Sequence, residues 1–119
     1  MMDNREMAKV LAEMQGWELR RGTFVDEWYD SKGFWCGMVP NIEAPPEDGA
    51  YNPATNVAQA FEALKHWGPG RMWRIEKTSA EVIKVLLWDC DGIPVAGTDG
   101  FDLALTVTRA LVKAVQSES

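Results

Sequence analysis

The amino-acid sequence predicts an α+β fold in the form of a three-layer α-β-α sandwich, with an antiparallel sheet as the middle layer. Three segments carry apolar residues at helical spacing, and three short apolar segments separated by turn residues form a pattern typical of a β-meander. Residues 82–88 are apolar at both strand parities, which is typical of a strand covered on both faces. Amphipathic helices on both faces of one sheet satisfy these observations.

The first helix is predicted over residues 4–15. Asp3 and Glu6 have the spacing of a capping box, which satisfies backbone amides in the first turn of a helix. The apolar residues that follow share one helical face: Met7, Val10, Leu11 and Met14. Gly16 suits the left-handed residue that ends many helices, and Trp17 is placed to fold back onto the last turn.

A β-hairpin is predicted over residues 23–37, because the Asp-Ser-Lys-Gly turn at 30–33 separates two aromatic segments. Residues 38–53 contain four prolines and are predicted to be a long surface loop. Long loops are often functional, so this one is a candidate recognition segment. The alternative is an ordered segment that packs on the domain surface through Met38, Val39 and Ile42.

A second helix is predicted over residues 54–66, with Asn52 or Thr55 as its cap. A Gly-Pro-Gly sequence at 68–70 ends this helix. A three-stranded meander follows, over residues 72–77, 82–89 and 93–97.

A last helix is predicted over residues 101–116, capped by Thr98, Asp99 or Asp102, with a broad apolar face. The sequence shows no internal repeat and no second domain. Residues 1–119 are therefore predicted to form a single domain.

Four short motifs follow one another along the chain. They are Met14-Gln15-Gly16-Trp17, Trp28-Tyr29-Asp30, Tyr51-Asn52-Pro53-Ala54-Thr55-Asn56, and the closing stretch from Ala96-Gly97-Thr98 to Thr108-Arg109-Ala110-Leu111. In order and spacing, nearly end to end, they resemble a family of small bacteriophage proteins called the phage ABA sandwich domain. The resemblance implies an α-β-α sandwich encoded by a phage or prophage, and it implies no established activity and no catalytic residues. The sequence departs most from the family in the loop at residues 38–50.

Charge and composition narrow the classes of partner. Twelve basic and eighteen acidic residues give a net charge of -6, which disfavours binding to duplex nucleic acid. No segment approaches the ~18 uncharged apolar residues that span a bilayer, and the opening residues lack the apolar core of a signal peptide. Cys36 and Cys90 cannot build a disulfide framework. These features predict a cytoplasmic protein, in the bacterial host cytoplasm if it is phage-encoded, with no membrane partner.

No metal site, cofactor or catalytic constellation is predicted, and the protein is not expected to be an enzyme. The Asp-Cys-Asp-Gly sequence at 89–92 begins like a calcium loop, but a strand follows in place of further oxygen ligands, which favours a hairpin turn. Cys36, His66 and Cys90 lack the paired spacing of a zinc site. A thiol nucleophile with His66 as base, oriented by Asp89 or Asp91, is the weaker alternative.

Residues 65–74 are the one locally basic segment of the acidic chain and include two tryptophans. Aromatic faces beside guanidinium groups can stack a base and hold a phosphate, so the segment is a candidate site for a small anionic ligand or nucleotide. The candidate residues are Lys65, His66, Trp67, Arg71, Trp73 and Arg74. In the competing interpretation, the tryptophans enter the core and the arginines pair with the acidic segment at 23–50.

Three of the six tryptophans lie in segments rich in charged and turn residues, which predicts an exposed aromatic patch. Trp28, Trp35 and Trp73 are therefore candidate interface residues, and a symmetric homodimer is the simplest way to cover them. The sequence thus predicts an accessory protein of a phage or prophage that binds itself, or a host or phage protein. The alternative is a protein that binds or sequesters a small anion or nucleotide through residues 65–74.

Overall fold

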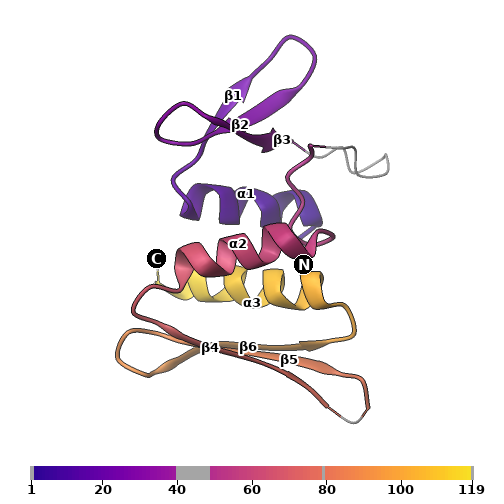
Figure 1. The fold of residues 1–119 in the computed structure, drawn as a ribbon, viewed down its shortest axis with the longest axis vertical. Helices are drawn as coiled ribbons and strands as arrows, with labels where there is room; N and C mark the ends of the chain where they lie inside the picture. Colours follow the sequence, from indigo (N-terminus) through magenta and orange to yellow (C-terminus); the bar gives the residue numbers. More distant parts are fainter. Residues whose placement is uncertain (1, 40–48, 79, 119) are drawn as a thin grey trace.

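Three helices lie between two antiparallel sheets in the residues that the computed structural model describes, 2–39, 49–78 and 80–118 (Figure 1). The helices are α1 (Asn4–Met14), α2 (Val57–Trp67) and α3 (Leu103–Glu118). The strands of the first sheet are β1 (Glu18–Arg21), β2 (Asp26–Tyr29) and β3 (Trp35–Met38), in that spatial order. Those of the second are β4 (Met72–Lys77), β5 (Ile83–Trp88) and β6 (Pro94–Gly100), again in that order. The α+β class is therefore confirmed.

The layers are ordered sheet, helices, sheet, whereas the sequence predicted helices on both faces of one sheet (Figure 1). Helix α3 packs on β5 and β6 and also contacts α1 and α2. Val85 and Leu87 of β5 are buried toward the helices, but Leu86, on the opposite face, is only half-buried. The prediction that strand 82–88 is covered on both faces is therefore wrong. All three described helices lie on the same side of this sheet, because α1 and α2 pack against α3.

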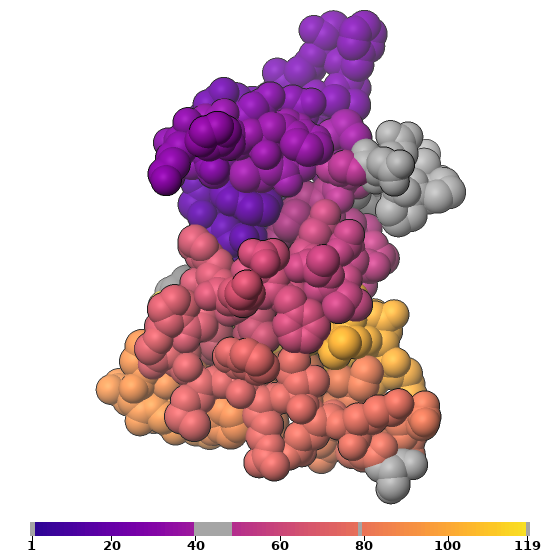
Figure 2. All heavy atoms as spheres, viewed as in Figure 1, coloured from indigo at the N-terminus to yellow at the C-terminus, as the bar shows by residue number. Residues whose placement is uncertain are grey.

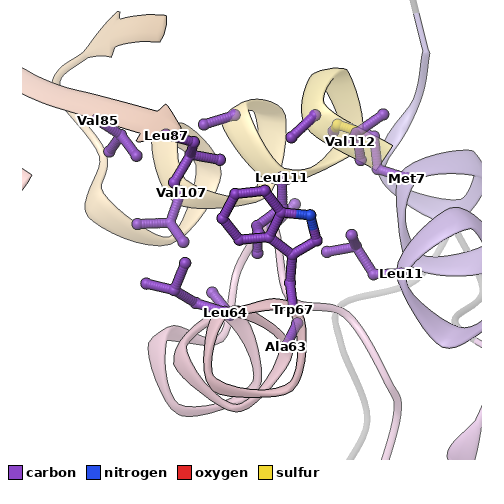
Figure 3. Close-up of a cluster of buried hydrophobic side chains, with 14 residues drawn as sticks. Met7, Leu11, Ala63, Leu64, Trp67, Val85, Leu87, Val107, Leu111 and Val112 are labelled. Carbon is purple, nitrogen blue, oxygen red and sulfur yellow. The ribbon is translucent and has the colours of Figure 1, made fainter. Parts of the chain in front are cut away.

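Helix α1 contributes to two clusters of buried side chains. Met7 and Leu11 join the main core with α2, α3 and β5 (Figure 3). Ala8 and Ala12 pack with Trp28 of β2 and with Tyr51, whose ring meets Trp17 edge to face with centroids 4.7 Å apart. These alanines leave room for the large aromatic side chains of Trp28 and Tyr51. Helix α1 thus packs on the other two helices with one part of its surface and on the first sheet with another.

The predicted N-terminal caps are confirmed for two of the three described helices, α1 and α3. Asp3 accepts a hydrogen bond from the Glu6 amide at 2.8 Å, and Asp102 accepts one from the Leu105 amide at 2.9 Å. The predicted cap of α2 is wrong: Asn56 accepts from the Gln59 amide at 3.1 Å, in place of Asn52 or Thr55. Asn52 begins the preceding turn, where its carbonyl oxygen accepts from the Asn56 amide at 3.0 Å.

The predicted hairpin at 23–37 is confirmed as β2 and β3, and the meander as β4, β5 and β6. Strand β1 was not predicted; its four residues are exposed, and it pairs with β2 so that Leu19 lies opposite Trp28. Most of the loop predicted at 38–53 lies outside the described residues. At its described ends, Met38 and Ala50 form a parallel bridge.

Candidate functional site

Trp67 of the basic segment belongs to the main core. Its side chain is 2% exposed and lies among Leu11 of α1, Leu64 of α2 and Leu111 of α3 (Figure 3). A ligand from solvent cannot stack on this indole without opening the core. The structure therefore removes Trp67 from the candidate ligand site, as the competing interpretation of this segment expected.

Arg71 is held by three hydrogen bonds to two residues of the chain. Its Nη1 donates to the carbonyl oxygen of Trp67 at 2.7 Å, and Nε and Nη2 donate to the two carboxylate oxygens of Glu118 at 3.2 and 2.8 Å. The guanidinium also lies over the Trp67 ring, 4.8 Å from its centroid. A hollow of about 360 Å³ lies beside these residues, and Glu118 occupies the guanidinium face that a ligand anion would need. Arg71 thus joins the end of α2 to the end of α3.

The other cations of the segment also have carboxylate partners. Lys65 lies 3.6 Å from Glu62 on the same helix, and Arg74 forms an ion pair with Glu76 on the same strand. Arg74 lies on the face of β4 opposite to Ile75, which packs toward the core. Three of the six candidate residues, His66, Trp67 and Arg71, thus line the 360 Å³ hollow. Lys65 lies on the surface of α2, and Trp73 and Arg74 lie on opposite faces of β4. The arginines pair as expected, but with Glu118 and Glu76 in place of the acidic segment 23–50.

The three candidate interface tryptophans do not form one patch. Trp28 is 3% exposed and buried over α1, so the structure removes it as a contact residue. Trp35 is 49% exposed in the first sheet, and Trp73 is 47% exposed in the second. The two sheets lie at opposite ends of the molecule (Figure 1). Figure 2 shows the β1–β2 hairpin, coloured purple, projecting away from the rest of the molecule.

Burial accounts for the state of the Cys36 thiol, and hydrogen bonds within the turn account for the acidic residues at 89–92. Burial raises the pKa of the Cys36 thiol, which disfavours the reactive thiolate at neutral pH. Asp89 accepts from the amides of Asp91 and Ile93 at 2.9 Å each, as in the predicted hairpin turn. In the described part of the chain, no group of three or more His, Cys, Asp or Glu residues is placed to hold a metal ion. The described helices include none long and apolar enough to cross a membrane.

The face of the second sheet that points away from the helices carries an apolar row and a charged row. We call it the outer face of the β4–β6 sheet. The cross-strand register places Met72 beside Trp88 and Trp88 beside Pro94 at one end. At the other end it places Glu76 beside Lys84 and Lys84 beside Asp99. The remaining residues of this face lie between the two rows: Arg74, Leu86 and Gly97.

Met72 is 62% exposed at the corner of this face, and Pro94 is exposed at the other end of the apolar row. The sequence contained a signal for this surface, because Leu86 and Trp88 have the opposite strand parity to Val85 and Leu87. From the sequence alone, that parity predicts a second buried face. It marks instead a face that the described part of the chain leaves without a covering layer.

The outer face of the first sheet holds the exposed Trp35 beside Tyr29, but the ring and the hydroxyl group of Tyr29 already have partners within the sheet. The Arg20 guanidinium lies 4.4 Å from the centroid of the Tyr29 ring, and the Tyr29 hydroxyl donates to Glu27 at 2.8 Å. These contacts reduce what a partner would gain by covering Tyr29. The outer face of the β4–β6 sheet is therefore the stronger candidate for a binding surface.

Comparison with protein-family models, with curated proteins and with solved structures finds no match to this chain. The resemblance to the phage family therefore stays a prediction.

Proposed function

We propose that this protein acts by binding another protein through the outer face of the β4–β6 sheet, and that the partner is a second copy of the same chain. The observation that carries the proposal is the apolar row of Met72, Trp88 and Pro94, with Leu86 beside it. Sheets with apolar residues on both faces are normally covered on both faces. A contiguous exposed apolar surface with a polar rim is typical of a protein-binding site.

Charge supports a second copy as the partner. The chain has a net charge of -6, so two copies repel one another over much of their surfaces. The outer face is neutral, because Arg74 and Lys84 balance Glu76 and Asp99. A two-fold contact centred on the apolar row buries that row against its own copy and leaves the charged row at the rim.

We also propose, on the resemblance described above, that the chain is an accessory protein of a phage or prophage and works in the host cytoplasm. This role requires no catalytic step. The alternative of anion or nucleotide binding through residues 65–74 loses support, because Trp67 is buried and the three cations have carboxylate partners.

Sedimentation velocity over a concentration series tests the self-association. The wild type should change from monomer to dimer as the concentration rises. Trp88→Ala should weaken the dimer by about 2 kcal/mol, or about thirtyfold in the dissociation constant, as at an interface hot spot. Met72→Asp should keep the chain monomeric, because the dimer would bury the unpaired charge of the new carboxylate.

Trp35→Ala is the matched control, since it removes another half-exposed tryptophan from the other sheet. The control should dimerise like the wild type. A wild type that stays monomeric at millimolar concentration would contradict the proposal. An equal loss of association in Trp35→Ala and Trp88→Ala would do the same.

A further inference from the structure

A second hollow, of about 450 Å³, lies where β6 and α3 meet the start of the chain. This volume falls within the range of small-molecule sites in proteins, ~300–1,000 Å³. It is separate from the apolar row of the outer face and from residues 65–74. Neither self-association through the outer face nor ligand binding through residues 65–74 uses it.

The wall of the hollow is mainly apolar. Met7 of α1 and Val112 of α3 line it and are themselves buried, so their positions are fixed by the core. Met2 also lines it, half-buried against the same core. Methionine side chains are flexible and polarisable, and they adapt to apolar ligands of different shape. The wall therefore suits the apolar part of a ligand.

Two cations lie on the α3 side of the hollow. Arg109 and Lys113 are four residues apart on the helix, so they face the same side, and both are exposed. Unlike Lys65, Arg71 and Arg74, neither of them has a carboxylate within 4 Å in the part of the chain that the structure describes. Like charges at this spacing destabilise a helix, and an anion bound between them relieves that repulsion.

We propose that this hollow binds a small amphiphilic anion. The apolar part of the ligand packs on Met2, Met7 and Val112, and its carboxylate or phosphate group accepts hydrogen bonds from Arg109 and Lys113. Asp99, the acidic residue of the lining, lies on the β6 side, and its negative charge repels the anion. Asp99 also belongs to the charged row of the outer face, but the residues that contact the ligand, Met2, Met7, Val112, Arg109 and Lys113, include none from that face, so the inference does not depend on self-association.

Methyl NMR of the chain labelled at the methionine Cε atoms tests the site, with three probes titrated below the concentration at which they form micelles. The probes are decanoate, decyl phosphate and uncharged decanol. At least one anion should shift the Met2 and Met7 methyl signals in a saturable way. Saturation by decanoate alone identifies a carboxylate ligand, and saturation by decyl phosphate alone identifies a phosphate ligand.

The double variant Arg109→Gln/Lys113→Gln should bind the anion about tenfold more weakly or worse, because hydrogen bonds to charged groups are lost. Both residues are exposed, so the variant should keep the wild-type melting temperature. Asp99→Asn should bind the anion more tightly. The matched control is Arg5→Gln/Lys9→Gln, an exposed cation pair with the same spacing on α1 that does not line the hollow.

The control variant should bind like the wild type. The proposal fails if neither anion shifts the two methyl signals saturably. It fails equally if decanol binds as tightly as the anions and the double variant binds them unchanged.

Discussion

Arg71 is expected to stabilise the fold and not to bind a ligand. Replacing it with alanine removes the hydrogen bond to the Trp67 carbonyl oxygen at 2.7 Å and the two bonds to Glu118. It also removes the guanidinium from the face of the Trp67 ring. The Arg71→Ala variant therefore separates a structural role from a ligand-binding role.

The expected loss follows from these contacts. A hydrogen bond to a charged donor contributes about 1.5 to 3 kcal/mol, and partial exposure of Arg71 favours the lower end. Stacking on an aromatic ring adds about 0.5 to 1 kcal/mol, and an accessible ion pair adds about 0.2 to 1 kcal/mol. Since one side chain makes all these contacts, we expect a total loss of about 2 to 3 kcal/mol. At ~4 °C per kcal/mol for a domain of this size, the melting temperature should fall by about 8 to 12 °C.

Thermal and urea unfolding, followed by tryptophan fluorescence, measure this loss, with Arg74→Ala as the matched control. Arg74 pairs with Glu76 at a more exposed place on the surface, so its replacement should cost less than ~0.5 kcal/mol. Equal stability of the two variants would refute the structural role of Arg71. If, in addition, Arg71→Ala abolished binding of a nucleotide that stabilises the wild type, Arg71 would be a ligand residue.

Three further predictions concern titration, capping and metal. Burial raises the pKa of Tyr51 above its usual value of about 10, so the unfolded chain ionises first and stability should fall as the pH rises above about 10. Tyr51→Phe removes the hydrogen bond from Gln15 and should lose about 1 kcal/mol of stability at neutral pH. Between about pH 9 and 11, its urea midpoint should fall less steeply than that of the wild type. Asp102→Ala should lose about 1 kcal/mol in urea unfolding, because it removes the cap of α3, while Asp102→Asn should retain most of that stability; equal losses in both variants would argue against capping. Excess chelator should leave the melting temperature of the wild type unchanged, and a large drop would reveal a structural metal.

The local elements could be predicted from the sequence because their signals are local. The capping aspartates and the turn residues at 30–33 and 89–92 act within a few residues of their own positions, and strand β4 has the predicted bounds. Strand β1 could not be predicted, because Glu-Leu-Arg-Arg has no apolar alternation and is a strand through its pairing with β2. The order of the layers also could not be predicted from the sequence. It depends on which surface of α1 meets α3 and which meets the first sheet.

In the candidate site, too, the sequence predicts local features but not those that depend on long-range packing. The pattern of charges and tryptophans at 65–74 did not distinguish a ligand site from a core tryptophan with paired arginines. The deciding partner of Arg71 is Glu118, which lies 47 residues away in the chain. The strand parity of Leu86 and Trp88 indicates a second apolar face on the β4–β6 sheet. The sequence alone does not show whether another layer of the protein covers that face. Long-range packing decides both questions.

The most direct test of self-association through the outer face of the β4–β6 sheet is an isotope-filtered NOE experiment. The sample is an equimolar mixture of ¹³C-labelled and unlabelled chains at a concentration where sedimentation shows a dimer. NOEs are expected between the Met72 methyl group of one copy and the Trp88 ring of the other, since both belong to the apolar row. A dimer whose intermolecular NOEs come from Trp35, with none from Met72 or Trp88, would contradict self-association through this face.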